Sequence, residues 1–372
     1  MAPISNGSDR NLLSSPGNEK PPKFERQQVE YEDLTIDFND KLIDFSKQFC
    51  HIYSIRLADL RAVLIPRVIA KWGKIQILKL AELEDFEEQE CVIIGTLYKH
   101  QKWKPSILHE LSEDHQLTLS EPKSNYCSEK DLLFLEDEML RIRLLIEDAE
   151  LKNYVTGNSV KTVTKTNTLM GHAEGKAQDA TIAKEVAVAT TLLDTFLTKI
   201  ATCCCVTLMP GQHDPANTML PQKSLHPCIL PLTSRFESFK GVTNPWIGKV
   251  AERIIMGSSG QPIEDIVKAT GMTDISPLNW LERTLVWRHM CPTAPDTLPV
   301  YPYSVKDPFI INYCPDIYFV GNTDEFETKL WIGEENQMVR LICIPKYSST
   351  NLAVMVDIET LDTTTINFGT SI

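Results

Sequence analysis

One stretch of the chain combines helix and strand signals in an order that few fold classes allow. Apolar residues recur at helical spacing over several turns, at Ile182, Val186, Ala189, Leu193, Phe196 and Ile200. A short apolar run at 203–209 follows, and it stops at Pro210-Gly211 before a His-Asp pair. A helix, a strand and then a polar loop in direct succession is typical of an α/β fold.

Three adjacent cysteines, Cys203, Cys204 and Cys205, open this apolar run. Cysteines beside apolar residues favour a buried strand in a reducing compartment over a disulfide framework. The chain has ten cysteines but no Cys-x-x-Cys pair, which disfavours a structural zinc site.

The first half of the chain gives a helix and then strands. An apolar stripe predicts a helix over 40–65, capped by Asn39, interrupted at Arg56 and ended or kinked by Pro66. Strands are expected at 91–98, 132–135 and 139–145, with a short helix at 106–111. Residues 146–178 are polar and show no firm period.

The second half continues the α/β pattern. A strand at 253–256 leads through Gly257-Ser258-Ser259-Gly260 into a helix that opens at Pro262. A helix at 274–288 and a strand at 317–320 follow. The segments 339–344 and 352–358 are predicted to close the domain as a hairpin.

Composition limits the functions that such a chain can perform. Residues 1–38 are predicted to form a disordered tail, and their start has no apolar core typical of a secretory signal. No apolar run approaches the length that spans a membrane. The formal net charge of −13 disfavours tight, autonomous DNA binding.

The loop Gly211-Gln212-His213-Asp214 has two interpretations. His and Asp are metal ligands or a general base, but one such pair supplies at most two ligands to a metal. The alternative is a turn in which Asp214 accepts a hydrogen bond from a nearby backbone N–H, and spacing alone favours this turn. The Gly257–Gly260 segment matches no nucleotide-binding motif and favours a tight strand-to-helix turn.

Two other segments are candidate binding surfaces. Lys99, Lys102, Trp103 and Lys104 combine charge with an aromatic ring, which is a weak indication of contact with single-stranded nucleic acid. The proline-rich segment 291–303 predicts a rigid extended loop with little entropy to lose on docking. Its candidate partner-binding residues are Pro292, Pro295, Asp296, Tyr301 and Tyr303, whereas His289 beside it is expected to be structural. The acidic run at 80–90 indicates a solvated face or a docking site for a basic partner.

Several long segments resemble one known family. They are FCHIYSIRLADLRAVL, LYKHQKWKPSIL, MPGQHDPANTMLPQKSLHPC and LVWRHMCPTAPDTLPVYPY, the last followed by DPFIINYCPDIYFVGNTDEFETK. In this order they are similar to the B-subunit family of replicative DNA polymerases, closest to its DNA polymerase delta branch. The resemblance spans roughly residues 40–150 and 155–368.

The resemblance implies a fold and a loss of catalysis. Family members join an OB fold to a calcineurin-like phosphodiesterase domain that is inactive in the eukaryotic subunits. Active relatives carry D-x-H, G-D-x-x-D, G-N-H-[DE] and G-H-x-H. Here the third motif has Gln212 in place of the ligating Asn, the last reads Gly321-Asn322-Thr323-Asp324, and the first two are absent. We therefore expect vestigial loops with no metal, no other cofactor and no catalytic residue.

The family plan also predicts that a central block of the chain is missing. Residues 151–157 resemble the middle of the OB barrel, whereas Asn158 and its successors resemble a point well inside the phosphodiesterase domain. The expected architecture is α/β plus β: a helix and a partial OB fold at 39–157, then a phosphodiesterase-like domain at 158–372 without its first strands. Such a chain exposes sheet edges and core surface, which predicts a loss of stability.

By resemblance, the chain is expected to be a non-catalytic scaffold in the nucleus. It would join the DNA polymerase delta catalytic subunit, through that subunit's C-terminal cysteine-rich domain, to other accessory subunits in DNA replication and repair. It would contact DNA only through the complex, and no membrane. The alternatives are a B subunit of another replicative polymerase, a metal-dependent phosphodiesterase or exonuclease, and a single-stranded DNA-binding OB module.

Overall fold

The structure is a computed structural model that describes residues 29–369. Short gaps fall at 36–37, 39–42, 44–45, 47 and 87–89, and longer gaps at 105–124, 147–150 and 158–179. The expected short helix at 106–111 lies outside the described residues. None of the helices in the described ranges has the length and apolar character to cross a membrane.

The second half of the chain contains both helices and strands, as the sequence predicts. The helices are α1 (Cys50–Trp72), α4 (Ala180–Ala201), α5 (Gln261–Thr270), α6 (Pro277–Trp287) and α7 (Tyr347–Thr350), with 3-10 turns η2 (Leu80–Phe86), η3 (Pro227–Ile229) and η4 (Thr233–Arg235). The strands of the first half are β1 (Tyr31–Asp33), β2 (Gln76–Leu78), β3 (Cys91–Ile93), β4 (Thr96–His100), β5 (Leu132–Glu136) and β6 (Arg141–Leu144). Those of the second half are β7 (Val206–Leu208), β8 (Phe239–Gly241), β9 (Trp246–Val250), β10 (Arg253–Ser258), β11 (Ile317–Thr323), β12 (Glu327–Ile332), β13 (Met338–Pro345), β14 (Leu352–Val356) and β15 (Thr363–Asn367).

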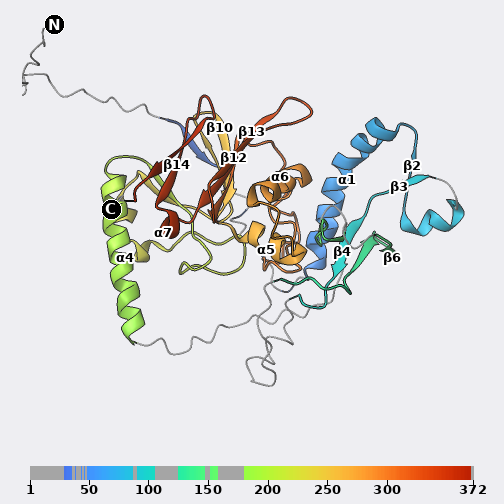
Figure 1. The fold of residues 1–372 in the computed structure, drawn as a ribbon, viewed down its shortest axis with the longest axis horizontal. Helices are drawn as coiled ribbons and strands as arrows, with labels where there is room; N and C mark the ends of the chain where they lie inside the picture. The colour runs from blue at the N-terminus through green and yellow to red at the C-terminus, as the bar shows by residue number, and fades with distance from the viewer. Residues whose placement is uncertain are drawn as a thin grey trace, which may run out of the picture.

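A six-stranded mixed sheet forms the centre of the molecule, in the order β1-β9-β10-β11-β13-β12. Strands β10, β11 and β13 are parallel, and the outer pairs are antiparallel. Helix α6 packs on β11, β12 and β13, and α5 packs on α6. Figure 1 shows these two helices between the sheet and α1, while α4 stands at the opposite end of the molecule. The largest core cluster, which includes Trp280, Leu341 and Val320, fills this central layer.

The N-terminal part holds a small antiparallel sheet beside the long helix α1. Strands β4, β5 and β6 form a three-stranded meander, and β2 pairs with β3 in a separate ribbon. The backbone N–H of Gly157 donates to the carbonyl of Leu97, so residues 155–157 lie against β4. An OB barrel closes with about five strands. In the described residues the meander has three strands, and whether the OB fold is partial stays a prediction.

The expected disordered tail is wrong at its C-terminal end. Residues Tyr31–Asp33 form β1, which pairs antiparallel with β9 at the edge of the central sheet. Phe38 is buried, and its ring lies 5.9 Å from that of Phe309. The alternation of apolar and polar residues in this segment is too short to predict a strand from the sequence. Pairing with β9 orders it as a strand.

Three expected boundaries also need correction. The strand predicted at 91–98 is two strands, β3 and β4, which separate at Ile94-Gly95. The segments 339–344 and 352–358 do not pair as a hairpin: β13 pairs with β11 and β12, and β14 pairs with β15. Helix α1 begins at Cys50 and continues through Pro66 to Trp72.

The helix predicted at 182–200 is confirmed as α4, but the prediction of a buried cysteine-rich strand is wrong. Cys203, Cys204 and Cys205 are all exposed, and they lie in the turn between α4 and β7. All ten cysteines are free thiols. A short apolar segment in a sequence can be a buried strand or an exposed turn before a strand, and the residue types alone do not distinguish the two.

Candidate functional site: convergent polar loops and a buried interdomain cluster

The two segments expected to be vestigial approach each other, although the strands that carry them belong to different sheets. Gly211 follows β7, and Asn322 lies in β11 with a left-handed φ of 58°. A Cβ atom placed on Gly211 would lie 3.9 Å from both Asn322 Nδ2 and Ser259 Oγ. Gly211, Ser259 and Asn322 therefore lie close together.

Within the first loop, Asp214 makes a local turn. Its Oδ2 atom accepts a hydrogen bond of 2.6 Å from the backbone N–H of Gly211, as the turn interpretation predicts. Gln212 and His213 are exposed. In the second loop Thr323 is buried, and the exposed Asp324 forms an ion pair with Lys346. The carboxylates of Asp214 and Asp324 are therefore engaged in local contacts.

Behind these loops, amide and hydroxyl side chains bond to one another. Asn244 is fully buried, and its Nδ2 donates to Gln222 Oε1, Ser259 Oγ and Gln261 Oε1 at 2.7, 2.7 and 3.0 Å. Its Oδ1 accepts the backbone N–H of Ser259 at 3.0 Å. Asn322 Nδ2 donates to the Ser259 carbonyl at 2.7 Å. We call Gln222, Asn244, Ser259, Gln261 and Asn322 the amide network.

The chemistry of the amide network is that of hydrogen-bond donors and neutral acceptors. A dinuclear metal site needs several carboxylate and imidazole ligands that converge on one point. Across the residues that the structure describes, no three His, Cys, Asp or Glu side chains are grouped to hold a metal ion. Sequence reasoning missed Gln222, Asn244 and Gln261, because isolated amides carry no motif.

A cleft of about 350 Å³ adjoins the amide network. Its lining includes Gln212, His213, Gln222 and Gln261. The buried Asp265 on α5 also faces it, and burial raises the pKa of this carboxyl although the Thr297 hydroxyl donates to it.

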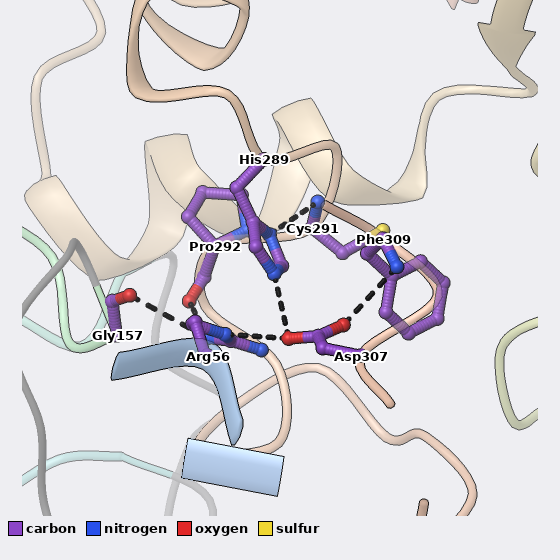
Figure 2. Close-up of polar contacts among 7 residues, drawn as sticks. All are labelled: Arg56, Gly157, His289, Cys291, Pro292, Asp307 and Phe309. Carbon is purple, nitrogen blue, oxygen red and sulfur yellow. Dashed lines mark hydrogen bonds and ion pairs between the residues drawn. The ribbon is translucent and has the colours of Figure 1, made fainter. Parts of the chain in front are cut away.

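A second polar cluster joins the N-terminal helix to the C-terminal part (Figure 2). Arg56 on α1 is 1% exposed, and its Nε lies 2.6 Å from Asp307 Oδ2. Its Nη1 donates to the carbonyls of Pro292 and Gly157 at 3.2 and 3.5 Å. His289 Nε2 lies 2.9 Å from the same Asp307 oxygen. Arg56, which interrupts the apolar stripe of the helix, is thus one partner of a buried ion pair with Asp307.

The hydrogen bonds of this cluster define the charge of each member. His289 Nδ1 accepts the backbone N–H of Cys291 at 3.1 Å, so the proton of a neutral ring is on Nε2 and points to Asp307. Burial, with the Arg56 guanidinium beside it, lowers the pKa of His289 to about 4. Burial alone would raise the pKa of Asp307, but Arg56 and His289 together hold it below its usual range. The cluster is therefore one Arg–Asp ion pair with a neutral His, and the expectation of a structural His289 agrees with it.

The proline-rich segment 291–303 is an internal part of this interface. Pro292 and Tyr303 are buried, Asp296 is ion-paired with Lys104 at 2.8 Å, and Pro295 and Tyr301 are half-buried. The prediction that these five residues form an open partner-binding loop is wrong for Pro292 and Tyr303. The stiffness of the prolines instead holds a core segment between the two halves of the chain.

The basic candidates Lys99 to Lys104 do not share one open surface. Lys99 is buried, and its Nζ donates to the carbonyl of Ala269 near the C-terminus of α5 at 3.2 Å. An ammonium at this helix end interacts favourably with the helix dipole. Lys104 faces Asp296, while Lys102 lies over the ring of Trp103 with its Nζ 4.9 Å from the ring centre. Two of the three lysines therefore connect the halves of the molecule.

Comparison with known proteins places these features in one class. Residues 48–168 match the family model described as the DNA polymerase delta subunit OB-fold domain, and residues 154–328 match the model that describes the B subunit of DNA polymerases alpha and epsilon. An OB-fold part followed by a B-subunit part defines the accessory B subunits of replicative DNA polymerases.

The relatives narrow this class to one family. The chain is 32% identical over 426 positions to DNA polymerase delta subunit 2 of Drosophila melanogaster, an alignment that covers 92% of this chain and 98% of the relative. It is 31% identical to the DNA polymerase delta small subunit of Arabidopsis thaliana, over 94% of this chain and 97% of the relative. The small subunit of Saccharomyces cerevisiae is 25% identical over 87% of this chain and 90% of the relative. The chain belongs to the DNA polymerase delta small-subunit family.

The alignment with the Drosophila relative shows that this chain lacks residues that the relative has. The 426 aligned positions include 92% of the 372 residues, which is about 342, so about 84 positions have no residue of this chain. Because the alignment covers 98% of the Drosophila relative, these positions hold residues of that relative. The chain therefore lacks residues within the region that it shares with this relative, and their placement as one central block stays a prediction.

Proposed function

We propose that the chain is a non-catalytic accessory subunit of DNA polymerase delta that acts as a scaffold. It joins the catalytic subunit, through that subunit's C-terminal cysteine-rich domain, to the remaining accessory subunits. Its place of action is the nucleus, in replication and repair synthesis, and it reaches DNA through the complex. Family membership supports this assignment, since the relatives are named as delta small subunits.

The observation that carries the non-catalytic part of the proposal is the amide network. It includes Asn322 and lies beside Gly211, which belong to the two segments that the proposal treats as vestigial, and its neutral groups bond to one another. Asn244 is buried and uses both Nδ2 and Oδ1 in hydrogen bonds. A network of this kind stabilises loops, and it offers no metal-activated water for hydrolysis.

The buried interdomain cluster supports the scaffold part. A scaffold can hold its partners in a defined arrangement only if its own parts are fixed relative to one another. Arg56, Lys99 and Lys104 each extend from the N-terminal part to an acceptor at 289–307 or on α5. Buried ion pairs and hydrogen bonds of this type specify one arrangement of two elements, because any other arrangement leaves a buried charge unpaired.

Co-purification tests the assignment. The chain is co-expressed with the cognate DNA polymerase delta catalytic subunit, either intact or with its C-terminal cysteine-rich domain deleted. We expect capture of the intact catalytic subunit and loss of capture with the deletion. Equal capture of both forms would contradict the proposed docking domain, and capture of neither would contradict the scaffold assignment.

Two assays on the isolated chain distinguish the rival functions. A phosphodiesterase would hydrolyse a nucleotide diester with added Mn²⁺, and His213→Ala would abolish this activity. A single-stranded DNA-binding module would bind an oligonucleotide with strong salt dependence. We expect neither result, since Lys99 and Lys104 are turned inward and the amide network consists of neutral groups.

A further inference from the structure

One face of helix α5 lines the cleft of about 350 Å³ that adjoins the amide network. Four side chains at positions i, i+3, i+4 and i+7 of this helix belong to the lining, namely Gln261, Glu264, Asp265 and Lys268. Tyr126, parts of the segment 218–222 and the segment 297–299 complete it together with Gln212 and His213. The volume lies at the lower end of the range for ligand pockets, about 300–1,000 Å³, so the cleft suits a small group.

Asp265 brings a buried carboxyl to this cleft without a cation beside it. Its side chain belongs to a residue that is 7% exposed, and its Oδ2 atom accepts a hydrogen bond of 2.5 Å from the Thr297 hydroxyl. The ammonium on the same helix face, that of Lys268, pairs with Glu264 at 2.9 Å. Two carboxyl groups and one ammonium therefore line this wall. A buried charge without a partner is costly, so a cation bound in the cleft would stabilise the charged form of Asp265.

The electrostatic field of the cleft favours a cation over an anion. Burial raises the pKa of Asp265, and the Thr297 hydroxyl and the Lys268 charge offset only part of this effect. Burial, and then the charges of Asp265 and Glu264, raise the pKa of Tyr126 to about 12. Because Tyr126 also lines the cleft, its pKa indicates a negative potential there.

The other lining groups match a guanidinium better than an ammonium. A guanidinium is planar, carries five N–H donors and is weakly hydrated, so it suits pairing with a carboxylate at a buried site. The exposed Gln212 and Thr218 offer an amide and a hydroxyl oxygen to further N–H groups. Leu298 and Pro299 offer apolar surface to an aliphatic stem. These are the groups that one arginine side chain requires.

We propose that this cleft binds an arginine side chain from an exposed segment of a partner polypeptide, with the guanidinium at Asp265. The stem of the arginine lies against Leu298 and Pro299, and Gln212 and Thr218 accept hydrogen bonds from its outer N–H groups. The inference goes beyond the proposed function, because a scaffold assignment specifies neither this site nor its ligand. It is tested on the chain alone, so its failure is distinct from a failure of co-purification with the catalytic subunit.

Three capped tripeptides test the proposal on the unchanged chain. Each has two alanines on either side of a central arginine, citrulline or lysine, and ligand-observed NMR titration gives the Kd of each. Citrulline has nearly the shape of arginine but carries no charge. We expect the citrulline peptide to bind about tenfold more weakly than the arginine peptide, because it cannot form an ion pair with Asp265. We expect the lysine peptide to fall between the two, because an ammonium lacks the planar fork.

A substitution at the carboxyl provides the sharper measurement. Asp265→Asn keeps the shape of the side chain and removes its charge, and it is expected to weaken binding of the arginine peptide about tenfold. Glu252→Gln is the matched control, because it removes one charge from an exposed side chain that pairs with Lys249 outside the cleft. The control separates the site from the general attraction of a cation to a chain with a net charge of −13, and we expect it to leave the Kd unchanged.

Several results would overturn the proposal. Equal binding of the arginine and citrulline peptides, or no binding of the arginine peptide at about 10 mM, would exclude a guanidinium site, and both are measured on the unchanged chain whether or not the variant folds. Equal binding of the arginine peptide by the unchanged chain and by Asp265→Asn would place the ligand elsewhere. Equal binding of the arginine and lysine peptides would exclude guanidinium recognition, and displacement of the arginine peptide by a nucleoside monophosphate would assign the cleft to an anion.

Discussion

The Nε atom of Arg56 lies 2.6 Å from the Oδ2 atom of Asp307, although 251 residues separate the two in the sequence. Both side chains are removed from solvent, and the same carboxylate oxygen accepts from His289. This one ion pair connects the N-terminal helix to the segment that follows the prolines. The first three predictions concern the cluster around it.

Replacing Arg56 with Leu should destabilise the chain strongly. The substitution leaves the Asp307 carboxylate buried without a cationic partner, with only His289 and the backbone N–H of Phe309 as hydrogen-bond donors. Loss of one partner of a buried ion pair costs about 3–5 kcal/mol of unfolding free energy. Urea denaturation measures this change. Arg61→Leu is the matched control on the same helix, because its pair with Glu138 is partly exposed and should contribute less than about 1 kcal/mol. Equal effects of the two substitutions would contradict a special role for Arg56.

Acid should weaken the fold well before the carboxylates titrate. His289 is neutral in the folded chain with a pKa of about 4, compared with 6.5 in the unfolded chain. Between these two values the unfolded state binds the extra proton, so stability falls as the pH falls from about 6.5 to about 4, by about 3 kcal/mol in total. Urea denaturation across this range measures the slope. His289→Gln should flatten it, and an unchanged slope in that variant would assign the effect to other groups.

Gly157→Ala should separate the two halves at the Arg56 contact. Gly157 has a φ of +90°, and an added Cβ would collide with the Pro292 carbonyl and lie 2.7 Å from Arg56 Nη1. We expect a loss of more than about 2 kcal/mol. Gly73→Ala is the control, because Gly73 also has a positive φ but has no atom near its Cβ position, so only the backbone penalty of about 1 kcal/mol applies. Thermal unfolding measures both, and a similar cost at the two sites would exclude the collision.

Metal ions should leave the stability of the chain unchanged. A site with a Kd of about 10 µM would add about 2.7 kcal/mol at about 1 mM Mn²⁺ by linkage alone. The amide network has no ligand set for such an ion, so we expect the same melting temperature with Mn²⁺, with Mg²⁺ and with EDTA. A rise with Mn²⁺ that His213→Ala removes would show that the loop retains a metal site.

The sequence predicted the elements with a strong period. Helix α4, the strand-to-helix turn at Gly257–Gly260 and the Asp214 turn all follow from local chemistry, namely periodicity, glycine and side-chain capping. The resemblance supplied the family, which single elements do not define.

What the sequence did not predict depends on contacts between distant residues. In the sequence Arg56 only interrupts the apolar stripe of a helix. The structure shows that it pairs with Asp307, which lies far away in the sequence. Prolines at 291–303 read as an exposed stiff loop, whereas contacts with Arg56 and Lys104 hold this segment against the N-terminal part. The amide network consists of single amides from separate loops, and no spacing along the chain brings them together.

Strand β1 has a consequence for how the chain acquires its structure during synthesis. Its partner is β9, so residues 31–33 cannot dock until the ribosome has made residue 250. The segment that leads into α1 is therefore held by the half of the protein that is translated later. The N-terminal half cannot complete its packing on its own while it emerges, and fusions at the amino end should disturb the central sheet before they disturb the small meander.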